Sequence, residues 1–295
     1  MFELSLLNMM TLTTLTVLVG LLITFSVCLN LQQIRRTTDE FNYRLRNVAP
    51  YLGTAALFFL AKRATHKYSL QISYALDWNI TDELYAIEGK FVAILQNLVP
   101  ETTLEFFSAM YMFGFPFLVV APLILYFLLP SQRHLKELLI AYLLNYLIGS
   151  ICYTLFIAYV PRNHLASVDG LMYQFYPQTQ DLTAAVSANT YVFPSLHTSL
   201  AIVVLLFAWR SRREYPRWFP IAAFVVAGVV FSTMYLGIHW VLDVVAGVML
   251  GAGTIYAAEQ FVARVESRTT QVSASKESGG SITPDMNKRY PLQKS

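Results

Sequence analysis

The chain has 295 residues, of which 56% are hydrophobic and only 13% are charged. Because soluble domains carry about 25% charged residues, this composition indicates an integral membrane protein. The net charge of +3 is small and the basic residues fall in short clusters between apolar stretches, so no nucleic-acid partner is expected. Cys28 and Cys152 lie in separate apolar stretches and form neither a disulfide framework nor a metal motif.

Apolar stretches of the length that a transmembrane helix needs, about 20 residues, recur along the chain. The clear ones are Leu6–Leu29, Leu104–Leu129, Leu138–Val160, Phe219–Gly237 and Trp240–Val262. Ser195–Trp209 is shorter but uninterrupted after His197, whereas Ala49–Ala61 is short and weakened by Pro50 and Gly53. We therefore predict an all-α integral membrane bundle of six spans, or of seven if Ala49–Ala61 also crosses.

Three regions are expected along the chain. Residues 1–103 form an N-terminal anchor span followed by an interfacial region, in which Phe91–Leu98 is predicted to be a short amphipathic helix. Residues 104–264 form the catalytic helical core. Residues 265–295 are predicted to be a disordered cytoplasmic tail, because from Ser267 onward the chain is polar and rich in Ser, Thr, Gly and Lys.

Basic residues in short loops mark the cytoplasmic side of a membrane protein. They occur at residues 133–136, 210–217 and 264–276, so alternation of the spans places the 161–194 loop and the 237–240 turn on the extracytoplasmic face. The Arg35–Arg46 cluster is cytoplasmic only if Ala49–Ala61 spans, which would put Lys62, Arg63 and Lys67 outside; charge alone leaves this open. We expect location in the cell membrane with an extracytoplasmic active site.

Ionisable residues at the ends of apolar spans are costly unless they have a function. Four such residues fall on the predicted outer face, Arg162, His197, His239 and Asp243, and the polar Ser195 accompanies them. Each has a structural interpretation by itself: an interfacial anchor for Arg162, a helix start for Pro194-Ser195, and a polar pair for His239 and Asp243. Their occurrence together on one face favours a phosphate-ester site.

The chemistry of these residue types supports that interpretation. His239 and Asp243 are four residues apart, so on a helix the carboxylate can orient the imidazole and leave its other nitrogen free as a nucleophile toward phosphorus. His197 is the candidate general acid and base. Arg162 and Ser195, with the N–H groups that open the following helix, are the candidate phosphate ligands.

At these residues the chain resembles the type 2 phosphatidic acid phosphatase superfamily. The family's PSGH motif reads Pro194-Ser195-Leu196-His197, its third motif reads Ser232-Thr233 followed by His239 and Asp243, and its first motif is reduced to Pro161-Arg162. The resemblance covers about Val160 to Gly247. It implies a phosphatidic-acid-phosphatase type 2/haloperoxidase-like helical core, with His239 as nucleophile, Asp243 as its orienter and His197 as acid and base. The same resemblance implies phosphate binding by Arg162 and Ser195.

The sequence departs from the family pattern at three positions. Leu155 stands where the first-motif lysine would fall, Leu196 replaces the glycine of PSGH, and Thr233 replaces the arginine of the third motif. This pattern is similar to the branch that includes fungal inositol phosphorylceramide synthase. It implies an inositolphosphotransferase-like enzyme that moves a phospho-head group from a membrane lipid to a lipid or polyol acceptor.

Other functions remain open on the sequence. Hydrolysis of a phosphatidic-acid or isoprenoid-phosphate substrate by water would use the same residues. A metal site built from His197, His239 and Asp243 is a second enzyme class, although no metal or cofactor is expected. A non-catalytic transporter or scaffold is a third class, and the sequence does not predict the oligomeric state. We read the aromatic residues, Trp240 among them, as interfacial belt residues.

Overall fold

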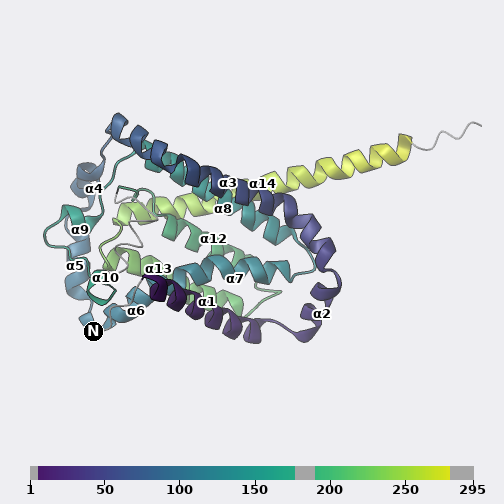
Figure 1. Cartoon of the computed structure of the whole chain (residues 1–295), viewed down its shortest axis with the longest axis horizontal. Helices are drawn as coiled ribbons and strands as arrows, with labels where there is room; N and C mark the ends of the chain where they lie inside the picture. The colour runs from purple at the N-terminus through teal and green to yellow at the C-terminus, as the bar shows by residue number, and fades with distance from the viewer. Residues whose placement is uncertain (1–5, 177–189, 280–295) are drawn as a thin grey trace, which may run out of the picture.

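The computed structural model describes residues 6–176 and 190–279, which are overwhelmingly helical (Figure 1). The N-terminal helices are α1 (Leu6–Cys28), α2 (Leu31–Asp39), α3 (Phe41–Leu76), α4 (Thr81–Glu88), α5 (Phe91–Leu98), the 3-10 turn η1 (Glu101–Thr103), α6 (Leu104–Ala109), the π-helix η2 (Met110–Gly114) and α7 (Phe115–Phe127). They are followed by α8 (Arg133–Leu155), α9 (Pro161–His164), α10 (Met172–Phe175), α12 (Leu196–Arg210), α13 (Trp218–Tyr235) and α14 (Val241–Gly279).

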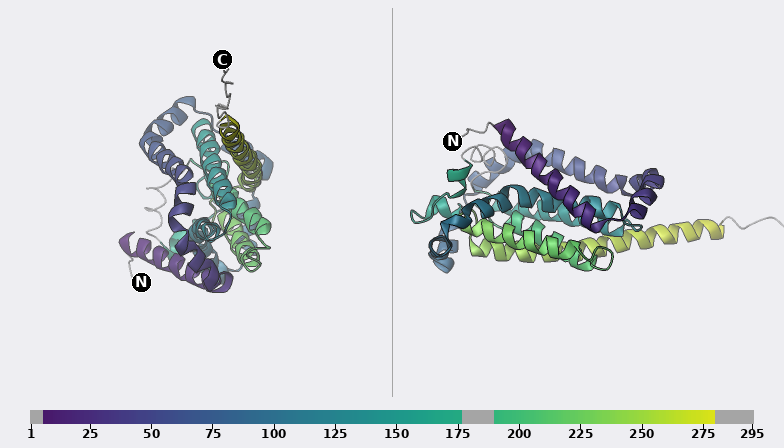
Figure 2. Two further views of the ribbon diagram at one scale, coloured as in Figure 1. Left: turned by 90° about the vertical axis from the view of Figure 1, so that its right-hand side faces the viewer. Right: turned by 90° about the horizontal axis from the view of Figure 1, so that it is seen from below.

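Long helices lie lengthwise beside one another and form an elongated bundle (Figure 2). The short helix α12 lies at its centre, where it contacts α7, α8, α13 and α14. Leu200, Val203 and Phe207 of α12 are fully buried in the main apolar core. Because α12 is enclosed by longer helices, it needs less length than a helix that faces lipid.

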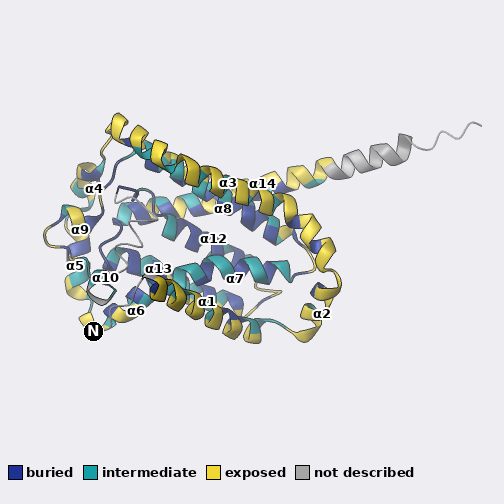
Figure 3. Cartoon of the chain, in the orientation of Figure 1, coloured by how far each residue is buried: buried dark blue, intermediate teal, exposed yellow. Residues whose placement is uncertain are grey.

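Five helical segments are long and apolar enough to cross a membrane: Leu7–Cys28, Glu101–Phe127, Arg133–Leu155, Trp218–Tyr235 and Val241–Arg268. They coincide with the clear spans expected from the sequence, and α12 is the shorter apolar helix. Many large apolar side chains face outward, especially on α1 and α3 (Figure 3). Outward apolar surface of this extent requires a lipid solvent, which confirms the all-α integral membrane fold.

The doubtful segment Ala49–Ala61 lies inside α3, a helix of 36 residues that Pro50 and Gly53 do not interrupt. Proline is tolerated inside helices of membrane bundles because neighbouring groups compensate for the lost hydrogen bond. Pro50 and Gly53 therefore do not break the helix, although α3 is not among the segments that are long and apolar enough to cross a membrane.

Helix α3 runs parallel to α8 along much of its length (Figure 1). The Lys136 ammonium lies 5.8 Å from the Tyr51 ring, and the rings of Phe59 and Tyr146 are 5.0 Å apart. Further along, the hydroxyls of Ser69 and Thr154 are 2.6 Å apart. The two helices therefore begin and end at the same ends of the bundle.

The basic clusters gather at one end of the bundle, which we call the basic end. The Arg44 guanidinium donates to the carbonyls of Phe127 and Leu129, at 3.1 and 2.7 Å, and Arg217 donates to the Val27 carbonyl at 3.1 Å. The start of α3 therefore lies beside the α7–α8 connection, and the end of α1 lies beside the α12–α13 connection. The opposite end, which we call the loop end, carries residues 156–176, 190–195 and the 236–240 turn.

Helix α14 continues to Gly279 and projects beyond the other helices (Figure 1). The predicted disordered tail begins at residue 265, so its first part, through Gly279, is helical instead. A helix that is already nucleated by a span can add residues at the gain of one hydrogen bond each, even where the sequence is polar. Residues 280–295 lie outside the described part of the chain.

Candidate active site

The α13–α14 turn holds His239 at the loop end. Gly237 has φ +67°, and a Cβ at this position would lie 2.8 Å from a Val168 methyl group, so only glycine fits. The Thr233 carbonyl accepts hydrogen bonds from the backbone N–H groups of Ile238 and His239, both at 3.0 Å. The backbone therefore fixes the position of the His239 Cα before any side chain contributes.

Trp240 holds the turn from its other side. Its indole N–H donates to the Tyr159 carbonyl at 2.9 Å, and its side chain is fully buried in a small apolar cluster under the loops. Trp240 is thus a buried anchor of the turn, and the interpretation as an interfacial belt residue was wrong. The sequence could not separate the two roles, because an interfacial tryptophan and a buried tryptophan can both stand at the end of an apolar span.

Asp243 is completely buried beside His239 in the first turn of α14. Its Oδ2 lies 3.4 Å from His239 Nδ1 and accepts a shorter hydrogen bond, 2.8 Å, from the Trp240 N–H. The carboxylate therefore both caps the helix and faces one imidazole nitrogen. Such a contact favours the tautomer with hydrogen on Nδ1, which leaves Nε2 unprotonated.

The α12 N-terminus adjoins this turn directly. The Ser195 N–H donates to the Asp243 carbonyl at 3.0 Å, and Ser195 Oγ caps α12 by accepting from the Thr198 N–H at 3.3 Å. Added Cβ atoms on Gly247 and Gly251 would lie 2.6 and 2.5 Å from the carbonyl oxygens of Ser195 and Ser199. These two glycines let the backbones of α12 and α14 touch, which places the two histidine-bearing segments together.

His197 lies near His239, with 6.0 Å between the ring centroids. It is flanked by the rings of Tyr111, at 4.7 Å, and Phe115, at 4.4 Å. Tyr111 belongs to the π-helix η2, a form of distortion that often marks functional sites.

Arg162 approaches from the 156–176 loop. The backbone N–H of Arg162 donates to the Gly237 carbonyl at 3.3 Å, and its side-chain Nη2 donates to the Tyr173 hydroxyl at 2.8 Å. Burial and the nearby Arg162 charge lower the pKa of His239 to about 3. His239 is therefore a neutral imidazole at physiological pH, which is the form that a nucleophile requires.

Glu88 of α4 supports the same turn and was not predicted from the sequence. Its carboxylate accepts from the N–H groups of Val241 and Leu242, at 2.9 and 3.2 Å, which open α14. Burial raises the pKa of Glu88, and these two hydrogen bonds oppose that rise. No local sequence signal distinguishes Glu88 from the other acidic residues of α4, since its role depends on a contact with a residue more than 150 positions away.

The structure brings all five predicted residues, Arg162, Ser195, His197, His239 and Asp243, to one place at the loop end. Tyr111 and Tyr173 also lie at this place, and they were not predicted from the sequence. For Tyr111 the only available signal was a tyrosine within an apolar span. The Ser195 Oγ already accepts a hydrogen bond as the cap of α12, so only its hydroxyl hydrogen is free to be donated to a ligand. Within the described residues, no group of three or more His, Cys, Asp or Glu side chains is arranged to hold a metal ion.

The three departures from the family motifs have structural consequences. Leu196 packs on Gly149 of α8, where an added Cβ would lie 2.6 Å from a Leu196 methyl group. Thr233 is buried, its hydroxyl donates to the Val230 carbonyl, and it holds the turn through its own backbone carbonyl. Leu155 lines a groove between α3 and α8. None of the three supplies a cation to the site.

Comparison with known proteins gives one matching family model, described as the PAP2 superfamily, over residues 86–257. The match begins inside α4 and so includes Glu88. A protein of Methanocaldococcus jannaschii described as uncharacterized is 29% identical over 176 residues, which are 59% of this chain and 68% of that protein. The crystal structure of Aquifex aeolicus LpxE is similar with a TM-score of 0.47 and 20% identity, over 59% of this chain and 95% of that one.

Proposed function

Because the chain belongs to the PAP2 superfamily and has its membrane phosphatase fold, we propose that it is a head-group phosphotransferase acting on a membrane lipid. The donor is a phospholipid whose phosphate carries a polar head group such as inositol. The acceptor is the hydroxyl of a second lipid or of a polyol. Both half-reactions pass through a phosphohistidine on His239.

In the first step His239 Nε2 attacks phosphorus, so that a P–N bond forms and the P–O bond to the lipid alkoxide breaks. His197 binds a proton when the negatively charged phosphate enters, because the adjacent anion favours the imidazolium, and it donates this proton to the departing oxygen. The Arg162 guanidinium and the N–H groups at the start of α12 balance the negative charge on the equatorial oxygens. Asp243 stabilises the imidazole as positive charge develops on it.

In the second step the acceptor hydroxyl attacks the phosphohistidine. His197, now unprotonated, removes the hydroxyl proton while the new P–O bond forms and the P–N bond breaks. The enzyme returns to its starting protonation state. Phosphoryl transfer of this kind depends on positioning and electrostatics, which is consistent with a site that is rigidly held by backbone hydrogen bonds.

The observation that carries the proposal is the buried His239–Asp243 pair with a second imidazole 6.0 Å away. Transfer is further supported by the motif pattern: Leu155 and Thr233 stand where the family motifs have lysine and arginine, and Leu196 replaces a glycine, as in the phosphotransferase branch that the sequence resembles.

We further propose that α3 crosses the membrane as a seventh span and that the loop end is extracytoplasmic. The parallel run of α3 beside α8 and the gathering of the basic clusters at one end both support this orientation. Under it, Lys62, Arg63 and Lys67 lie toward the outer half of the membrane.

Hydrolysis of a lipid phosphate is the second candidate, favoured by membership of a phosphatase superfamily. The two reactions share the first step and differ in the acceptor. Purified protein incubated with a labelled phosphoinositide donor, with and without ceramide as the acceptor, separates them. A new phosphodiester that requires the acceptor supports transfer, whereas release of the head-group phosphate to water contradicts it.

The shared intermediate is tested by trapping. His197→Ala retains the nucleophile but lacks the base for breakdown, so it should accumulate acid-labile phosphate on His239 from an activated substrate such as a nitrophenyl phosphate, whose leaving group needs no proton. His239→Ala should accumulate none. Phosphate trapped on His197 instead would reverse the two roles.

A further inference from the structure

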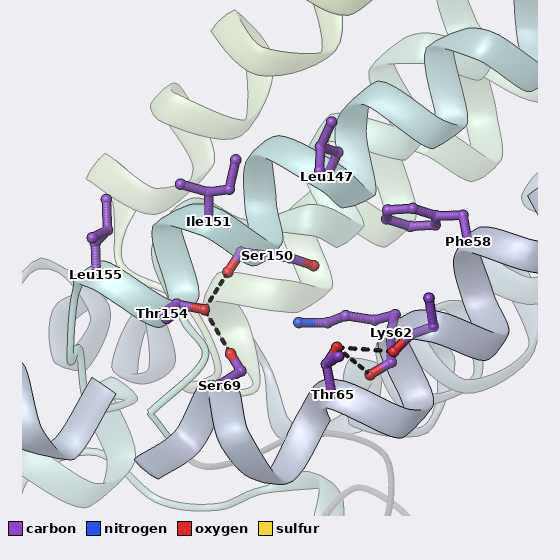
Figure 4. A pocket seen from close by; sticks show the side chains of 10 residues that line it. Phe58, Lys62, Thr65, Ser69, Leu147, Ser150, Ile151, Thr154 and Leu155 are labelled. Atoms are coloured by element: carbon purple, nitrogen blue, oxygen red, sulfur yellow. Dashed lines mark hydrogen bonds between the residues drawn. The ribbon is translucent and has the colours of Figure 1, made fainter. Parts of the chain in front are cut away.

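A groove of about 350 Å³ lies between α3 and α8, away from the histidines (Figure 4). Its volume is within the range of small-molecule sites, about 300–1,000 Å³. Apolar side chains of both helices form most of its lining: Phe58, Leu147, Ile151 and Leu155. The groove faces outward beside the exposed apolar residues Leu57 and Leu60 of α3, so in a membrane it opens to lipid.

Lys62 is the one charged residue that lines this groove. Figure 4 shows its ammonium group extending across the groove toward α8. The ion pairs of the described residues do not include Lys62, and its nearest aromatic contact is the Tyr191 ring, 5.9 Å away. An ammonium group among apolar helices is costly without a carboxylate partner, and a bound anion would compensate its charge.

The hydroxyls that surround Lys62 are mostly committed to the protein. Thr65 donates to the Ala61 carbonyl at 2.9 Å, Thr154 donates to the Ser150 carbonyl at 2.8 Å, and Ser69 then donates to Thr154. The side-chain hydroxyl of Ser150 makes no hydrogen bond within the described residues. Lys62 and Ser150 are therefore the two donors that remain for a ligand in the groove.

The groove lies at the same level along the bundle as the active site. Ser150 and Thr154 flank Tyr153, whose hydroxyl donates to the Pro194 carbonyl at 2.9 Å, directly before Ser195. The Tyr153 ring stacks on Tyr191, at 5.0 Å, and Tyr191 faces Lys62. A phosphate at Lys62 would thus sit at the depth of the histidines but separated from them by two tyrosine rings.

We propose that this groove binds an anionic phospholipid, which is not the phosphate that reacts at His239. Its phosphate oxygens accept from the Lys62 ammonium and the Ser150 hydroxyl, and its acyl chains lie on the apolar lining. A free phosphate would leave that lining in contact with no ligand, which favours the lipid. The bound lipid would support the Tyr191–Tyr153–Pro194 contacts that position Ser195 and His197.

Native mass spectrometry of the detergent-purified full chain tests this directly. The probes are phosphatidylglycerol and phosphatidylcholine of equal chain length, mixed in equal amounts. The wild-type protein should retain phosphatidylglycerol preferentially. Lys62→Met removes the charge at nearly constant volume and should weaken its binding about tenfold, the effect of losing one charge-assisted hydrogen bond; Ser150→Ala should weaken it less.

The matched control is Lys67→Met, which removes a charge from an exposed lysine on the same helix and should leave phosphatidylglycerol binding unchanged. Equal loss in Lys67→Met and Lys62→Met would show only general attraction to charge and would overturn the site. Undiminished binding by Lys62→Met, or equal retention of phosphatidylcholine by the wild type, would overturn it as well. The assay needs no turnover, so its result is independent of the phosphohistidine mechanism.

Discussion

Both ends of the bundle bury a carboxylate side chain, but the partners that surround the carboxylate differ. At the basic end Glu137 is fully buried and accepts from Arg133 at 2.8 Å and from Arg210 at 3.4 Å. At the loop end Asp243 is equally buried, yet its imidazole contact is 3.4 Å long and its Oδ1 has no partner among the described residues. The first charge is compensated by cations, whereas the second is held by a helix N-terminus and a neutral ring.

This difference separates structural from chemical use of a buried charge. Desolvating an ion costs several kcal/mol, and a buried pair recovers this only when its partners are close. Glu137 with two arginines connects α8 to α12. Asp243 Oδ1 keeps unused bonding capacity instead, as expected of a group that a substrate would complete. Substitutions at the two ends should therefore affect different observables.

The largest effect on turnover is expected from His239→Ala. Removal of the proposed nucleophile should abolish transfer and hydrolysis alike, while the melting temperature of the detergent-purified protein stays close to that of the wild type. Activity is measured as labelled product and stability as a thermal melt. Unchanged biological function in this variant would instead support a non-catalytic transporter or scaffold.

Asp243→Asn should slow turnover by about 10²–10⁴-fold, on the precedent of catalytic triads. Because Oδ2 both accepts from the Trp240 N–H and faces His239 Nδ1, the amide oxygen can take its place and keep the helix cap. The amide carries no negative charge, so it cannot stabilise the positive charge that develops on His239 during attack. Steady-state kinetics measures the loss, and near-normal kcat would refute the orienting role of the carboxylate.

Glu137→Gln should have the opposite profile, with lower stability and normal chemistry. Breaking a fully buried pair costs about 3–5 kcal/mol, but here both arginines keep solvent contact and acidic partners, Glu259 for Arg210 and Glu266 for Arg133. We therefore expect a loss of about 1–2 kcal/mol, seen as a melting temperature lower by several degrees. Glu266→Gln, at a more exposed site, is the milder control, and a selective loss of kcat in Glu137→Gln would contradict the comparison.

The sequence predicted the spans and the candidate site residues because both are local patterns. Hydrophobic length identifies a span, and four-residue spacing places His239 and Asp243 on one helical face. The spacing of Gly247 and Gly251 is likewise a local pattern typical of close helix packing, and both glycines contact α12. These features depend on residues within one or two helical turns of each other.

Other parts of the fold depend on contacts that no local pattern contains. The continuity of α3 through Pro50, the burial of Trp240 and the approach of Tyr173 to Arg162 each need a partner from a distant segment. The π-helix η2, which brings Tyr111 beside His197, follows from packing rather than from propensity. Sequence reasoning therefore predicted the candidate reacting groups and missed the residues that hold them in place.

The smallest effect is expected from Glu88→Gln. This variant tests the distinction between the candidate reacting groups and the residues that hold them in place. The carboxylate of Glu88 holds the N–H groups of Val241 and Leu242 with one oxygen each, whereas an amide can accept only one of them and presents N–H to the other. The turn that carries His239 should loosen, so kcat should fall several-fold, up to about tenfold, with little change in KM. Glu83→Gln, an exposed change in the same short helix α4, should leave both constants unchanged. A positioning role predicts that Glu88→Asp recovers part of the lost kcat, because a shorter carboxylate still accepts at both oxygens; equal defects in Glu88→Asp, Glu88→Gln and Glu83→Gln would show that α4 contributes only general packing.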